Sequence, residues 1–133
     1  MSLFVILALE KSPNTGELEA AAKELNYPIA YVEHVELKDQ SGFFPVKLSG
    51  EDSGFETYFV DYEGLKNYLP STESITFSNP VVFEFRWGSS TKEGAAIFYT
   101  AAIISLKYGG VVFSPEAGTF SSPEELIQTQ ISF

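Results

Sequence analysis

The feature that most constrains the fold is a helical segment without a polar face. Gly94–Leu106 is almost wholly apolar and lies between Glu93 and Lys107. Ser90 and Glu93 have capping-box spacing, and Tyr108–Gly110 has the composition of a helix C-cap, so both ends are marked. A helix with no strongly polar face is usually enclosed on most sides. The segment predicts a central core helix, or a helix with one stripe in a homodimer interface.

The strand before this helix carries the only Arg and the only Trp of the chain. In Val81–Trp87 the odd-numbered side chains are apolar and share one face, which leaves Glu84 and Arg86 on the other. The N-terminus of the helix favours anions, so Arg86, Ser89 and Ser90 form a candidate anion-binding site for a small-molecule sensor. The alternative is that Arg86 pairs with Glu84.

The remaining patterns predict one α+β domain over residues 1–133, with a mostly antiparallel sheet and helices packed against it. The predicted order is β-α-β-β-β-α-β-α-β-β-α. A ferredoxin-like core with additions or a diverged duplication would fit this order. The other predicted strands are Leu3–Leu9, Tyr31–Leu37, Phe43–Leu48, Phe55–Tyr62, Val111–Phe113 and Thr119–Phe120, with a short strand at Ile75–Phe77 as an option. The other predicted helices are Thr15–Leu25, Asp61–Leu69 and one that starts at Ser122–Glu125.

The charge is unevenly distributed. The net charge is −10, and residues 33–63 hold eight acids against two lysines. This field argues against binding to nucleic acid or to an anionic membrane, since both need basic contacts. Acids mixed with aromatic side chains suit a basic protein partner. The candidate partner-binding residues are Glu33, Glu36, Asp39, Glu51, Asp52, Glu56 and Tyr58. The alternative is that the acids serve solubility alone.

Residue types that carry chemistry are scarce. There is no cysteine, and His34 is the only histidine. His34 and Glu36 share one face of the predicted strand, but no third ligand is placed by spacing, so we expect neither a metal site nor a cofactor. A carboxylate-dependent enzyme stays an alternative, because carboxylates are plentiful. The N-terminal segment lacks a basic region and is interrupted by Glu10, which favours a soluble, cytoplasmic protein.

The C-terminal third has a distinctive order: a strand ending at Trp87-Gly88, an alanine-containing helix, Gly109-Gly110, a strand, and Ser122–Glu125. This order resembles the C-terminal part of small bacterial domains, some of which are similar to immunity proteins of toxin systems. The resemblance rests mainly on capping and turn signals and implies no catalytic residues. Together with the concentrated negative charge and the scarcity of catalytic residue types, it leads to the hypothesis of a non-catalytic, soluble bacterial protein that binds a basic protein partner as an immunity-like inhibitor.

Overall fold

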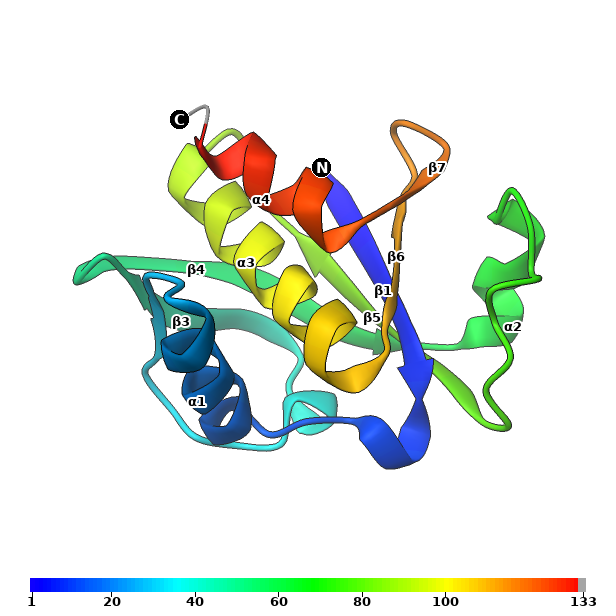
Figure 1. Ribbon diagram of the computed structural model, residues 1–133, viewed down its shortest axis with the longest axis horizontal. Coiled ribbons are helices and arrows are strands. Elements are labelled where there is room, and N and C mark those ends of the chain that lie inside the picture. The colour runs from blue at the N-terminus through cyan, green and yellow to red at the C-terminus, as the bar shows by residue number, and fades with distance from the viewer. Residues whose placement is uncertain (132–133) are drawn as a thin grey trace.

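The computed structural model describes residues 1–131, and the side chains of residues 1–128. Ser132 and Phe133, which the predicted domain includes, lie outside the described residues. The fold is α+β, as predicted, with one antiparallel sheet (Figure 1). Its strands are β1 (Ser2–Ala8), β2 (Ile29–Tyr31), β3 (Gly42–Leu48), β4 (Glu51–Val60), β5 (Pro80–Arg86), β6 (Val111–Ser114) and β7 (Thr119–Ser121). Its α-helices are α1 (Thr15–Leu25), α2 (Tyr62–Leu65), α3 (Thr91–Tyr108) and α4 (Pro123–Ile131), and 3-10 turns occur at η1 (Leu9–Lys11), η2 (Leu37–Asp39) and η3 (Lys66–Tyr68).

The order of strands across the sheet is β2-β3-β4-β5-β1-β6-β7, and every neighbouring pair is antiparallel. The predicted order of helices and strands along the chain is confirmed. The unit β5-α3-β6 is a split βαβ motif, as in ferredoxin-like folds, because β1 lies between its strands. The unit β1-α1-β2 instead crosses β5, β4 and β3. The two crossovers therefore differ in span, and the sheet lacks the symmetry of a simple duplication.

Helices α1, α3 and α4 cover one face of the sheet (Figure 1). On α3 the buried side chains include Ile97, Ile103 and Ile104, which share a core cluster with Phe83 and Phe85 of β5. Burial of such side chains contributes about 1.5–3 kcal/mol each to folding. The prediction of an enclosed helix is confirmed. Within the described residues, no helix has the length and apolar content that a transmembrane helix requires.

The predicted strand Tyr31–Leu37 is wrong beyond its first residue, because β2 ends at Tyr31. Backbone groups of the following loop bond to Thr15 at the start of α1. The Thr15 hydroxyl donates to the carbonyl of Glu33 at 2.6 Å and accepts from the amide of Val35 at 2.9 Å. A side chain from the helix thus satisfies groups that a neighbouring strand would otherwise pair. His34 and Glu36 are consequently not on one face of a strand.

The β3–β4 hairpin is tighter than predicted. Residues 49–54 were expected to form its loop, but only Ser49 and Gly50 do, with φ of 52° and 81°. Positive φ at both central positions is the geometry of a two-residue hairpin turn that follows the twist of the strands. As a result, β4 begins at Glu51, four residues before the predicted Phe55.

Within residues 1–131, the opposite side of the sheet carries no long helix, and we call it the open face. Strand alternation places on it Phe43 of β3, Glu56 and Tyr58 of β4, Glu84 and Arg86 of β5, Phe4 of β1 and Phe113 of β6. Residues of α2 and the loop after η3 cover one end of this face, where Leu65 packs with Ile6 and Val82. Ile75 and Phe77 pack there too, but no strand forms at residues 75–77.

Candidate functional site

A polar network crosses β4 and β5 on the open face. The antiparallel register sets Glu56 opposite Arg86 and Tyr58 opposite Glu84. Arg86 donates two hydrogen bonds to the Glu84 carboxylate, from Nε at 2.8 Å and from Nη2 at 3.2 Å. The guanidinium carbon lies 5.0 Å from the centre of the Tyr58 ring, within cation–π range. The Tyr58 hydroxyl donates to Glu56 Oε1 at 2.5 Å.

The members of this network differ in exposure. Glu84 is only 9% exposed, whereas the side chain of Arg86 is about half exposed. The bidentate bond compensates the charge of a carboxylate that sheet packing removes from water. The bond to Glu56 raises the pKa of Tyr58, and burial adds to this increase. The network thus joins four side chains, in which Arg86 compensates the charge of Glu84 and Glu56 keeps an uncompensated negative charge.

A hollow of about 480 Å³ lies beside the C-terminal part of β4, beyond the point where β3 stops pairing with it. The last pair of these strands is Gly42 with Thr57, so β4 continues beyond its neighbour. The segment from Lys38 to Ser41 forms one wall of the hollow, and the polar network forms another. Asp39 is thereby brought beside Tyr58 and Arg86.

A larger pocket of about 610 Å³ lies beyond Glu84 on the same face. Its floor includes Phe4 and the buried Phe113, whose ring centres are 6.4 Å apart. Its walls come from α2 and η3 on one side and from the β6–β7 turn on the other, and both segments are visible in Figure 1. The residues that line it are Phe4, Val60, Asp61, Gly64, Leu65, Tyr68, Glu84, Phe113, Pro115 and Gly118.

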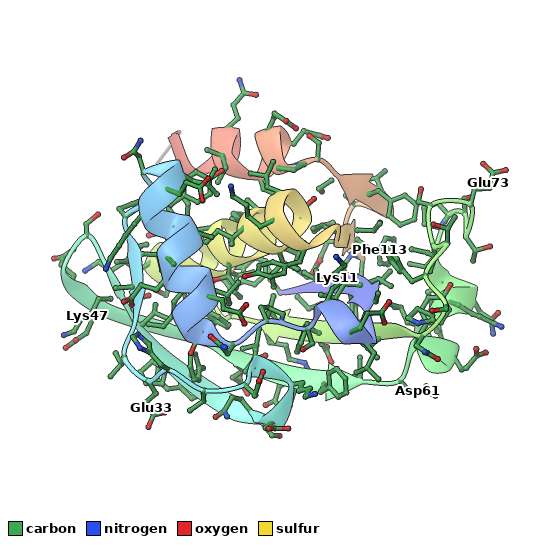
Figure 2. The ribbon with its side chains drawn as sticks, turned by 60° about the horizontal axis from the view of Figure 1, so that its bottom comes forward. Lys11, Glu33, Lys47, Asp61, Glu73 and Phe113 are labelled. Carbon is green, nitrogen blue, oxygen red and sulfur yellow. The ribbon has the colours of Figure 1, made fainter. Side chains whose placement is uncertain are left out.

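The eight acids of residues 33–63 do not form one compact surface. Figure 2 shows Glu33 and Asp61 at opposite ends of the molecule. Three of the eight are paired: Glu51 with Lys92, Asp52 with Lys47, and Glu63 with Lys66. The other five, within the described part of the chain, make no ion pair: Glu33, Glu36, Asp39, Glu56 and Asp61.

Of the predicted partner-binding residues, the structure brings together Asp39, Glu56 and Tyr58 around Arg86. Glu33 and Glu36 are exposed in the loop between β2 and β3. Glu51 and Asp52 lie at the start of β4, and their side chains point to opposite faces of the sheet.

The three residues of the predicted anion site are not brought together. Arg86 points to the open face and binds Glu84, the alternative that the sequence also allows. Ser90 caps α3, on the covered face, and its hydroxyl accepts from the amide of Glu93 at 3.3 Å. Ser89 is exposed in the connecting turn. Anion binding at this turn stays a prediction without support from the geometry.

Several titratable side chains bear on the question of metal binding or catalysis. Among the described residues, no three His, Asp or Glu side chains gather as a metal site requires. His34 lies 3.3 Å from Glu19 of α1, on the surface. Asp61 and Glu84 both line the larger pocket, and this pair is the feature that bears on the carboxylate-dependent alternative. Within this pair, Glu84 accepts two hydrogen bonds from the guanidinium of Arg86, which indicates a structural role for its carboxylate.

Sequence reasoning missed the larger pocket and the role of Glu84 in it. One signal was available, because Glu84 is the single acid in an otherwise apolar stretch from Val81 to Phe85. The pocket itself is lined by residues such as Gly64 and Gly118, which lie on segments far apart in the chain. No local pattern places those segments side by side.

No family model, no curated protein and no solved structure shows significant similarity to this chain.

Proposed function

We propose that this protein is a non-catalytic binding domain whose open face binds a basic protein partner, in the manner of an immunity-like inhibitor. The carrying observation is that five acids between residues 33 and 63 make no ion pair in the described part of the chain. Asp39, Glu56 and Asp61 border the open face. Unpaired acids leave a negative field that attracts a basic surface and speeds its association.

Phe43 supplies an apolar anchor within this field. It is 61% exposed and lies near the start of β3, beyond the residues that pair with the edge strand β2. The ring lies over Gly54 of β4, since a Cβ on Gly54 would lie 2.3 Å from Phe43 Cζ. The absence of a side chain on Gly54 therefore leaves the space that the ring occupies. An exposed aromatic side chain beside charged residues is typical of binding surfaces.

The first test identifies the partner by site-specific cross-linking in the native host. A photoreactive phenylalanine analogue at Phe43 should cross-link one basic protein. The matched control places the same analogue at Leu106 on α3, which is 45% exposed but belongs to the covered side. Equal cross-linking at both positions, or the recovery of acidic proteins alone, would contradict the proposal.

The second test measures affinity for that purified protein in low and in high salt. Asp39→Lys with Glu56→Lys should weaken binding by at least about tenfold, because like charges then face each other. The control, Glu10→Lys with Glu73→Lys, changes the net charge equally at exposed sites outside the network. If both double variants weaken binding equally, general charge and not the open face is responsible.

A further inference from the structure

We propose that the larger pocket on the open face is a binding site for a small apolar molecule that carries one ammonium group. This inference is independent of the protein-binding role proposed above. The volume, about 610 Å³, is in the range of pockets that hold small ligands, roughly 300–1,000 Å³. The depth is also suitable, because the floor reaches Phe113, which is 3% exposed.

The side chains that line the pocket favour a ligand whose main part is apolar. Leu65 and Phe113 are buried members of the apolar cluster on this face, Phe4 packs against it, and all three line the pocket. Tyr68 is 76% exposed at the rim, where it can close over a bound ring. Burial of an apolar ligand here removes both surfaces from water, which favours binding at about 25 cal/mol per Å².

The charges of the lining select for a cation. Asp61 and Glu84 are its two ionisable carboxylates, and none of the described residues that line the pocket is basic. Arg86 uses two of the acceptor positions of Glu84, and an ionised carboxylate offers about four. Asp61 Oδ1 accepts only a long bond, 3.4 Å, from the amide of Glu63. Asp61 therefore supplies the negative charge for a ligand ammonium, and Glu84, whose charge Arg86 compensates, can accept a further hydrogen bond.

The location of Gly64 provides a variant that blocks the pocket without harming the fold. Gly64 lies in α2 and lines the pocket, and a Cβ built on it meets no atom within 4 Å. Gly64→Leu should fill the space with a side chain. Since glycine is unfavourable within helices, neither this change nor the control Gly64→Ala should reduce stability.

The test is an NMR titration of the ¹⁵N-labelled full chain with three probes of one shape: biphenyl-4-ylmethylamine, biphenyl-4-ylmethanol and biphenyl-4-carboxylate. We expect the amine to shift the amides of residues 61–68 and 113–118. It should bind about fivefold more tightly than the alcohol, the effect of one partly exposed charge pair, and the carboxylate should bind more weakly still. Asp61→Asn keeps a residue that can cap α2 and should reduce the preference for the amine.

The outcomes separate clearly. Loss of all probe binding in Gly64→Leu, with binding retained in Gly64→Ala, would support the pocket as the site. Equal affinity for the three probes would overturn the preference for a cation. The absence of shifts at these amides, or unchanged binding in Gly64→Leu, would overturn the site itself.

Discussion

On the face that α1, α3 and α4 cover, Phe83 and Phe85 are fully buried, whereas on the open face Phe43 is 61% exposed and Tyr58 is half-buried. Both faces belong to the same strands and carry aromatic side chains. On the covered face, the rings fill a core beneath α3. On the open face, aromatic rings lie against the sheet or beside charges, and a pocket remains between them. The difference indicates that the covered face forms the main core, whereas the part of the open face around Phe43 and Tyr58 stays accessible to solvent.

The largest expected change in stability comes from removing one aromatic ring from each face. Phe83→Ala should lower the free energy of unfolding by about 3–5 kcal/mol, because it leaves a cavity in a packed core. Phe43→Ala should lower it by less than about 1 kcal/mol, since most of that ring is already in water. Urea denaturation of both variants measures the two effects. Similar losses would mean that the open face is part of the core.

A smaller difference in stability is expected between two ion pairs that differ in burial. Arg86→Ala leaves the carboxylate of Glu84 buried without its donor, which should cost about 1–2 kcal/mol. Lys47→Ala breaks a pair with Asp52 in which both side chains are largely exposed, so its urea midpoint should not change measurably. If Lys47→Ala matched Arg86→Ala, burial of Glu84 would not be the cause.

The covered face was predictable from the sequence because its signals are local. The bounds of α1 match the prediction. Helix α3 begins at Thr91, directly after the predicted cap Ser90, and it ends at the predicted C-cap segment. Alternation in Val81–Trp87 places Phe83 and Phe85 against α3 and leaves Glu84 and Arg86 on the other face. Helix capping and strand alternation both depend on residues that are close in the chain, so the sequence pattern alone indicates the helix ends and the two faces of the strand.

The open face was predictable only in part, because its features depend on distant segments. One segment on the covered side was also mispredicted for this reason: the Tyr31–Leu37 pattern is typical of a strand, but contacts with Thr15 of α1 hold the part beyond Tyr31 in a loop. The Arg86–Glu84 pair could be expected from strand alternation. The pocket could not, since it forms where α2 and the β6–β7 turn approach the same strands.

The attachment of β2 to α1 on the covered side gives a smaller, pH-dependent effect. Burial raises the pKa of Glu19, but hydrogen bonds from the amide of Tyr31 and from His34 outweigh it and lower the pKa below its ordinary value of 4.5. The unfolded chain therefore binds a proton at higher pH than the folded chain. The stability that Glu19 contributes is present above pH 4.5 and is lost as the pH falls through the lowered pKa.

Glu19→Gln tests this sign. The variant should be less stable than the wild type above pH 5 by on the order of a few tenths of a kcal/mol, and the difference should shrink toward pH 3. Urea denaturation at several pH values, with both proteins measured in parallel, cancels the contributions of the other acids. A difference that grew as the pH fell would contradict the lowered pKa.

The last comparison concerns two buried threonines on the covered side. Thr100 Oγ1 donates to the Ala96 carbonyl at 2.8 Å and lies 2.7 Å from the Tyr31 hydroxyl, whereas Thr57 Oγ1 is buried without a hydrogen-bond partner among the described residues. A buried hydroxyl without a partner loses its bonds to water and gains none, so Thr57→Val should be neutral or stabilising by up to about 1 kcal/mol. Thr100→Val has the same change in shape but leaves the Tyr31 hydroxyl without its partner, and it should destabilise. Parallel thermal denaturation of the two variants measures the contrast, and a loss of stability in Thr57→Val would show that its hydroxyl has a partner after all.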